Sequence, residues 1–178
     1  MKTYKLKNNR DVVIREALKS DAKDVIDFYN VVGGETNFLS FGKNEFNVTV
    51  EFEENYLFNI SNEENSILIL ALIDDLIIGA ASINSPQKRR LKHVGTLGIV
   101  IRQEYCKLGL GKILINELIN WAKSNNITKK ISLITRCDNE FAIELYKNLG
   151  FEIEGVLKKE NYEKGKYYDT ITMGLLLD

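Results

Sequence analysis

The 178-residue chain has the length of one globular domain and can bury a core without disulfides. Its 24 basic and 25 acidic residues leave a formal net charge of −1, which favours neither nucleic acid nor an anionic membrane as a partner. Two cysteines, Cys106 and Cys137, make neither a disulfide framework nor a metal-ligand cluster, so we expect no metal and a cytoplasmic protein. Residues 1–10 lack the apolar core of a secretion signal, and the longest apolar run, Ile67 to Ile73, is too short to span a membrane.

The first half of the chain predicts two helices and the beginning of a sheet. Ser20 is the expected N-cap of the first helix, and Gly33 and Gly34 are expected to end it. Asp74 and Asp75 indicate a turn between two apolar strands. In chain order the expected elements are a strand over 12–17, a helix between Ser20 and Gly33, a helix over 48–60, and strands over 67–73 and 76–83.

In the second half, strands alternate with amphipathic helices. The expected elements are a strand over 94–101, a helix from Leu110 to about Asn125, a strand over 131–135, a helix from Asp138 or Asn139 to Leu149, and strands over 151–157 and 167–176. A strand meander followed by this alternation predicts one α/β or α+β domain over residues 1–178, with a mixed sheet.

The loop after the strand over 94–101 has the features of an anion site. Gly109 and Gly111 open a helix there, and Lys112 follows them. Unpaired N–H groups and the helix dipole favour an anion at such a point, and glycine lets a phosphate approach the backbone. A tight strand-to-helix turn that needs glycine for its conformation alone explains the same residues equally well.

Two common phosphate-binding motifs do not fit this loop. A Walker-type loop needs glycine where Cys106 stands and serine or threonine where Ile113 stands. The dinucleotide-binding fingerprint needs a third glycine in place of Leu114.

A second group of residues lies on the helix that follows the strand over 131–135. Asn139, Ala142 and Tyr146 are spaced by three and four, so they share one helix face. The small side chain of Ala142 leaves a groove on this face, with the Asn139 amide at one end and the Tyr146 phenol at the other. Taken alone, Tyr146 is better explained as a core aromatic residue whose hydroxyl reaches solvent.

Together, the two segments resemble the GNAT superfamily of acetyl-coenzyme A-dependent N-acetyltransferases. The pattern Asn-x-x-Ala-x-x-x-Tyr-x-x-x-Gly-Phe is complete from Asn139 to Phe151, whereas Cys106 replaces the Gln or Arg that begins the family's loop motif. The segment from Glu154 to Met173 is similar to branches that contain ribosomal-protein and amino-acid or peptide acetyltransferases.

The resemblance implies a mixed, mostly antiparallel twisted sheet of about seven strands with about four helices. The central parallel strands would splay apart, and acetyl-coenzyme A would fill the gap. The implied activity is transfer of the acetyl group to a small amine, an amino acid or a peptide N-terminus. The alternatives are a non-catalytic acyl-coenzyme A sensor, and a protein-interaction domain whose loop amides are paired internally. A homodimer through the C-terminal strands is also typical of the family.

The resemblance further implies residue roles. The backbone of Ile99 and Ile101 would pair with the pantetheine arm, and an N–H near Ile99 or Val100 would stabilise the oxyanion. Tyr146 would donate a proton to the departing thiolate as general acid. The complete expected cofactor-binding set is Ile99, Val100, Ile101, Cys106, Lys107, Leu108, Gly109, Leu110, Gly111, Lys112, Asn139, Ala142 and Tyr146.

The acceptor side is less defined by the sequence. Glu35 is the candidate for amine recognition and the second expected catalytic residue, because a carboxylate can pair with a cationic acceptor. His93 is expected to be an exposed loop residue. Cys106, beside a helix N-terminus, is expected to have a lowered pKa. The remaining expectations are a solvated helix face with Glu51, Glu53 and Glu54, and a pocket shaped by Phe38, Phe41, Tyr162 and Tyr168.

Overall fold

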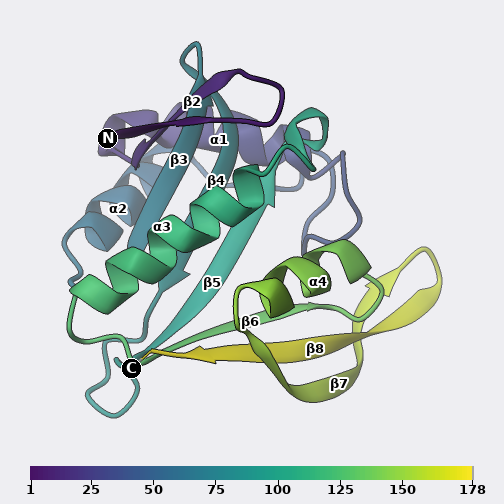
Figure 1. Ribbon diagram of the computed structural model, residues 1–178. Coiled ribbons are helices and arrows are strands. Elements are labelled where there is room, and N and C mark those ends of the chain that lie inside the picture. Colours follow the sequence, from purple (N-terminus) through teal and green to yellow (C-terminus); the bar gives the residue numbers. More distant parts are fainter. Residues whose placement is uncertain (178) are drawn as a thin grey trace.

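The structure is a computed structural model that describes residues 1–177. Figure 1 shows a sheet with helices on both sides. The helices are α1 (Ala22–Val32), α2 (Val50–Ser61), α3 (Leu110–Ser124) and α4 (Glu140–Asn148), with short 3₁₀ turns η1 (Lys19–Asp21) and η2 (Gln103–Tyr105). The strands are β1 (Lys2–Lys5), β2 (Asp11–Glu16), β3 (Ile67–Ile73), β4 (Leu76–Asn84), β5 (Val94–Ile101), β6 (Lys130–Arg136), β7 (Glu152–Glu163) and β8 (Lys166–Leu176).

Within residues 1–177, the eight strands form one sheet in the order β1-β2-β3-β4-β5-β6-β8-β7. Every neighbouring pair is antiparallel except β5 and β6, which run parallel. This confirms the predicted mixed, mostly antiparallel sheet.

The helices divide the core into two layers. Helices α1 and α2 cover one face of the first half of the sheet, and their cluster is built around Phe28, Leu57 and Leu70. Helix α3 covers the opposite face, and α4 lies over the β6–β8–β7 half (Figure 1). The second cluster joins Leu114 on α3 to Leu133 on β6, so one apolar layer runs beneath α3 and α4.

Three local features differ from the predictions. Strand β1 was not predicted, because it is a mostly exposed edge strand of polar residues in which only Tyr4 is half-buried. Ser20 lies inside η1 and is not the N-cap of the first helix; α1 begins after Asp21. Strand β7 continues to Glu163, beyond the expected end at Leu157, because after a register shift between Leu157 and Asn161 it pairs with β8 again up to the turn.

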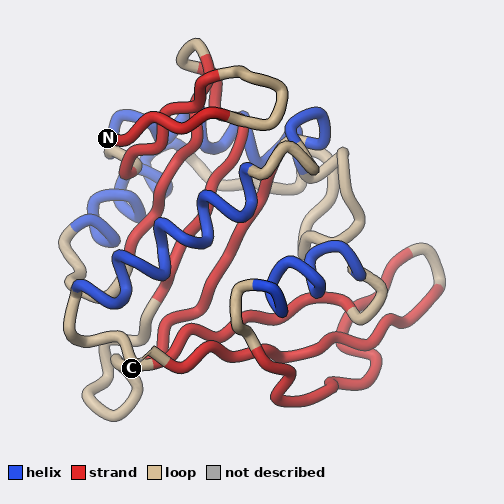
Figure 2. The backbone as a smooth tube through the Cα atoms, viewed as in Figure 1, coloured by secondary structure: helices blue, strands red, loops and turns tan. Residues whose placement is uncertain are grey.

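The sheet opens between its two parallel strands. β5 and β6 pair only over 94–96 and 130–132, whereas β5 pairs with β4 along nearly its whole length. Beyond Thr96 the two strands diverge, and Figure 2 shows the gap between them widening toward the C-terminal end of β5. The expected splay is therefore present. No helix within residues 1–177 is both long and apolar enough to cross a bilayer.

Candidate active site

One edge of β5 faces the splay without a partner strand. The Arg102 N–H donates to Ile78 O on β4 at 2.9 Å, and the β4–β5 register runs without a bulge. Alternate residues of an antiparallel strand direct their N–H and C=O groups to opposite sides. The backbone groups of Ile99 and Ile101 therefore face the open side, and those of Val100 face β4. Of the two amides expected near the oxyanion, the Ile99 amide has the suitable direction.

The loop that follows β5 adopts a conformation that requires glycine at one position. Gly109 is the N-cap of α3 and has φ 91°, and Lys107 also has a positive φ of 63°. A side chain at φ near 90° is strained, so Gly109 is needed for the turn itself. The turn directs the first amides of α3 away from the protein.

These amides have no internal partner. The Cys106 N–H donates to Gln103 O at 3.1 Å, and the Ile113 N–H donates to Gly109 O at 3.2 Å. Between them, no oxygen in residues 1–177 accepts a hydrogen bond from the N–H groups of residues 107–112. Six consecutive unpaired donors at a helix N-terminus match the electrostatics of a diphosphate. A protein-interaction domain without a ligand would instead have these amides paired within the protein, so the unpaired amides argue against that alternative.

Glycine at position 111 is favoured by packing, independently of any ligand. A Cβ at this position would lie 3.1 Å from Leu145 Cδ2 on α4 and 3.5 Å from Ile101 Cδ1. The absence of a side chain therefore lets the start of α3 approach both α4 and the end of β5.

Of the three residues expected on one helix face, Ala142 and Tyr146 lie in α4 and Asn139 immediately precedes it. Asn139 is at the N-cap position, but its side chain makes no cap and donates instead to Thr135 Oγ1 at 3.2 Å. Tyr146 is only 7% exposed, and its ring lies 5.9 Å from that of Phe151. Burial raises the pKa of Tyr146 to about 12. The phenol therefore keeps its proton at neutral pH, as a proton donor must.

Glu35 lies at the C-terminal end of β5. Its carboxylate accepts a hydrogen bond from the Gln103 N–H at 2.7 Å, at the start of η2. It is half-buried and close enough to Cys106 to affect that thiol. One carboxylate oxygen is thus engaged in holding η2, and the role of Glu35 in amine recognition stays a prediction.

The lowered pKa expected for Cys106 is wrong. Cys106 is exposed, but the partial desolvation of its thiol raises the pKa of that group, and the Glu35 carboxylate raises it further. Cys106 follows η2 and precedes α3. Its Sγ lies 3.9 Å from Ile101 O and 3.6 Å from Arg102 O, and both oxygens can accept a hydrogen bond from the thiol. Carbonyl oxygens and a carboxylate favour the neutral thiol over the thiolate.

The solvated helix face expected for three glutamates is wrong for one of them. Glu53 is 3% exposed, whereas Glu51 is exposed. Burial raises the pKa of the Glu53 carboxyl. The helix turns Glu53 toward the interior because Leu57, four residues on, lies on the same face.

The remaining expected residues do not form one group. His93 is exposed, and its carbonyl accepts the amides of Lys129 and Lys130 where β5 meets β6. Phe41 packs in an aromatic group with Tyr29 and Phe46. Phe38, Tyr168 and the exposed Tyr162 lie elsewhere, the first two around an arginine that the sequence analysis missed.

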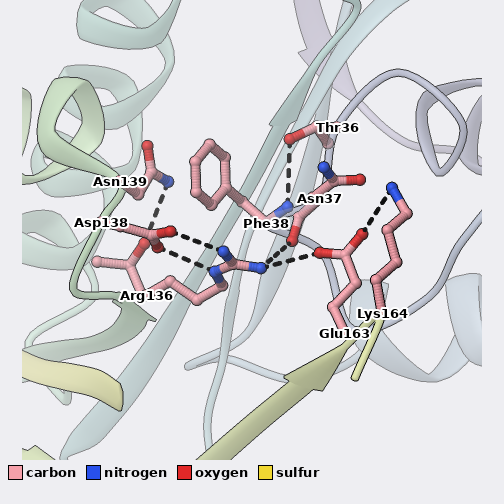
Figure 3. A network of polar contacts seen from close by, with 9 residues as sticks. Thr36, Asn37, Phe38, Arg136, Asp138, Asn139, Glu163 and Lys164 are labelled. Atoms are coloured by element: carbon pink, nitrogen blue, oxygen red, sulfur yellow. Dashed lines mark hydrogen bonds and ion pairs between the residues drawn. The ribbon is translucent and has the colours of Figure 1, made fainter. Parts of the chain in front are cut away.

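Arg136 is the centre of a polar network at the end of β6 (Figure 3). Its guanidinium pairs with both carboxylate oxygens of Asp138 at 3.0 and 2.7 Å, and with Glu163 Oε2 at 3.0 Å. It also donates to Asn37 O at 2.9 Å and lies 3.5 Å from the Tyr168 ring centroid. The local sequence offers little signal, since Asn37 and Glu163 are far from Arg136 along the chain.

Metal-binding side chains are not grouped in this region. Within residues 1–177, no cluster of three or more His, Cys, Asp or Glu residues is placed to hold a metal ion.

Comparison with known proteins places these features in a family. The model of the acetyltransferase (GNAT) family matches residues 36–151, which is more than half of the chain. The crystal structure of a GNAT-family acetyltransferase from Streptococcus pneumoniae is 35% identical, covers 94% of this chain and 99% of its own, and superposes with a TM-score of 0.91. The structure of a phosphinothricin acetyltransferase from Sinorhizobium meliloti in complex with acetyl-CoA is 18% identical. It covers 93% of this chain and 88% of its own, and it shares the fold with a TM-score of 0.81.

Curated relatives are similar over a shorter part. The L-amino acid N-acetyltransferase AaaT of Escherichia coli is 33% identical over 105 residues, 59% of this chain and 65% of the relative. N-alpha-acetyltransferase 50 of Danio rerio is 30% identical over 104 residues, 57% of this chain and 60% of the relative. The alignments thus span less than two thirds of these relatives' own length. The family match, the splayed sheet and the glycine loop agree, and the chain belongs to the acetyltransferase (GNAT) family.

Proposed function

We propose that the protein transfers the acetyl group of acetyl-coenzyme A to a primary amine. The observation that carries this proposal is the row of unpaired amides at residues 107–112, which continues from the open edge of β5. The diphosphate of coenzyme A would bind these amides and the dipole of α3. The pantetheine arm would pair with the backbone of Ile99 and Ile101 as an added strand.

In the proposed reaction the amine nitrogen attacks the thioester carbonyl carbon. The Ile99 N–H donates to the carbonyl oxygen as negative charge develops on it. The carbon–sulfur bond then breaks, and the Tyr146 hydroxyl gives its proton to the sulfur. The ammonium formed on the acceptor loses a proton to solvent, directly or through Glu35, and solvent returns the proton to Tyr146.

The acceptor we propose is the α-amino group of an amino acid or of a peptide. Support comes from the names of two relatives, an L-amino acid N-acetyltransferase and an N-alpha-acetyltransferase. A small amine of another kind would use the same cofactor site, because residues 107–112 and Tyr146 would contact coenzyme A and not the acceptor's side chain.

We also propose a cytoplasmic homodimer that associates through β7. This strand is the last in the sheet and pairs only with β8 within residues 1–177. Ile153 and Val156 on it are each 49% exposed, and an unpaired edge with apolar side chains favours association. Sedimentation equilibrium showing a monomer at all concentrations would contradict this assembly.

The deciding experiment is an acetyl-transfer screen that reads release of free thiol. The amines tested are L-amino acids, peptides with a free N-terminus, spermidine and kanamycin. We expect transfer to amino acids or peptides, and binding of coenzyme A in calorimetry. Binding without transfer to any amine would favour the sensor, and no heat of binding would refute the cofactor site itself.

A further inference from the structure

The loop between α1 and α2, residues 33–49, connects the two halves of the splayed sheet. Its later part is fixed to α1: the Phe46 N–H donates to Asn30 Oδ1 at 3.2 Å, and Phe41 and Phe46 pack on Tyr29. Its earlier part reaches the other half, where Asn37 O accepts from Arg136 at the end of β6. The loop therefore spans the open side of the splay.

Arg136 joins three segments at this point. Asp138 belongs to the turn that leads into α4, Glu163 to the end of β7, and Asn37 to the loop (Figure 3). The arginine side chain is only 5% exposed, and the guanidinium stacks on Tyr168 of β8. A planar guanidinium with five donors can hold all these partners at once, which a lysine ammonium cannot do with the same geometry.

Through Arg136, the loop over 33–49 and the β7–β8 hairpin meet at the end of β6, where β6 no longer pairs with β5. In the proposed reaction an amine would reach the acetyl group from this side of the splay. Phe38, next to the carbonyl that Arg136 holds, is 42% exposed, and its ring lies 5.2 Å from the guanidinium. Within the loop, the Phe38 N–H donates to Thr36 Oγ1 at 3.2 Å, and the hydrogen bond from Arg136 to Asn37 O ties this segment to the other half of the sheet.

We infer that Arg136 is a positioning residue that fixes the loop over 33–49 against the β7–β8 hairpin and thereby sets the affinity for the amine. This inference rests on the proposed acetyl transfer. It assigns Arg136 no contact with the reacting atoms and no effect on the diphosphate site at residues 107–112.

The first test uses Arg136→Lys and Glu163→Gln. The lysine keeps a positive charge but loses the bidentate geometry, and the glutamine weakens only the link to the hairpin. With the best amine of the screen, we expect KM for the amine to rise roughly tenfold to a hundredfold in Arg136→Lys. KM for acetyl-coenzyme A and the affinity for coenzyme A in calorimetry should stay within about twofold of wild type. Glu163→Gln should give a smaller rise of the same kind.

Arg15→Lys is the matched control. Arg15 also forms a two-point pair with a carboxylate, Asp21, at 2.6 and 2.8 Å, but it lies on β2 and does not contact the loop. It should not change either KM. Equal rises in Arg15→Lys, or a fall in kcat with both KM values unchanged in Arg136→Lys, would overturn the inference. If Arg136→Lys does not fold, a wild-type KM for the amine in Glu163→Gln would overturn it.

Hydrogen exchange separates this inference from the proposed function. Amides in the loop should exchange faster in Arg136→Lys than in wild type, whereas those of α3 should not. If wild type acetylates no amine, the proposed function fails, and the exchange data still decide whether Arg136 orders the loop. Unchanged exchange over 33–49 would overturn the inference.

Discussion

Gly111 at the start of α3 faces Leu145 on α4, and a Cβ on Gly111 would stand 3.1 Å from Leu145 Cδ2. The contact brings together the two sequence segments on which the family resemblance depends. The glycine loop and the face with Asn139 and Tyr146 are separated by more than twenty residues, yet they flank the same opening in the sheet. Each segment alone has a purely structural explanation. Because the two segments lie at the same opening in the sheet, a shared ligand site explains both better than two separate structural roles do.

Tyr146→Phe tests the proposed acid. We expect kcat to fall by about 10²–10⁴-fold, because the thiolate would leave without a proton. Affinity for coenzyme A should change little, since the phenylalanine keeps the packing on Phe151. Steady-state kinetics and calorimetry on the same preparations measure both quantities, and unchanged kcat would remove Tyr146 from the mechanism.

The pKa of Tyr146 predicts how wild-type turnover depends on pH. Since burial raises this pKa to about 12, the phenol stays protonated through the whole range in which the protein can be assayed. We therefore expect no loss of kcat from Tyr146 ionisation between about pH 7 and pH 10. An alkaline limb that disappears in Tyr146→Phe would contradict this.

Gly109→Ala tests the phosphate loop. The residue has φ 91°, so an alanine is strained by about 1–2 kcal/mol or shifts the turn. We expect a several-fold weaker affinity for coenzyme A in calorimetry, because the amides after Gly109 lose their common direction.

Gly165→Ala is the matched control for this backbone strain. Gly165 has φ 81° and lies in the β7–β8 turn, where an added Cβ meets no atom within 4 Å. It should destabilise the fold to a similar degree in urea unfolding without changing the affinity for coenzyme A. Equal losses of affinity in both variants would mean that strain, not the loop's amides, explains the result.

Glu53→Gln tests the buried carboxylate of α2. Burial raises the folded-state pKa of Glu53, so the folded protein holds this proton more tightly than the unfolded chain does. The free energy of unfolding should therefore decrease as pH rises from the ordinary carboxyl pKa through the raised one. Glutamine does not titrate, so Glu53→Gln should gain stability relative to wild type as the pH rises above the ordinary carboxyl pKa.

Urea unfolding at several pH values measures this difference. Glu51→Gln, on the exposed side of the same helix, controls for the loss of one negative charge from α2. Tyr29 and Tyr56 are the groups whose ionisation couples to Glu53, and burial raises the pKa of both, so they stay neutral over this range. A pH-independent effect of Glu53→Gln would contradict the buried carboxylate.

Cys106 should react slowly with alkylating agents. In a Cys137→Ser background, we expect the labelling rate to rise with pH and to reach half its maximum above the ordinary thiol pKa, because burial and Glu35 favour the neutral thiol. Coenzyme A should slow the labelling further, since the thiol precedes the loop that would bind it. Rapid labelling at neutral pH, mapped by mass spectrometry, would contradict the raised pKa.

The sequence by itself determined most of the elements and the mixed sheet. Short continuous apolar runs indicated β3 and β4, because strands buried on both faces are apolar throughout, and apolar residues at period 3.6 indicated α3, because one face of that helix is buried. The glycine loop was also visible in sequence, since the positive φ of Gly109 has a residue-type requirement. Edge strand β1 was not visible, because a strand with little buried surface leaves no apolar pattern.

Tertiary structure alone decided the features that depend on distant partners. Arg136 is an unremarkable strand-end residue until the fold brings Asn37 and Glu163 to its guanidinium. Glu53 was assigned to a solvated helix face together with Glu51 and Glu54, but α2 packs it inward and burial raises its pKa. Cys106 followed the same rule: the pKa of a side chain depends on the charges and dielectric around it, which the folded chain sets and the order of residues does not reveal.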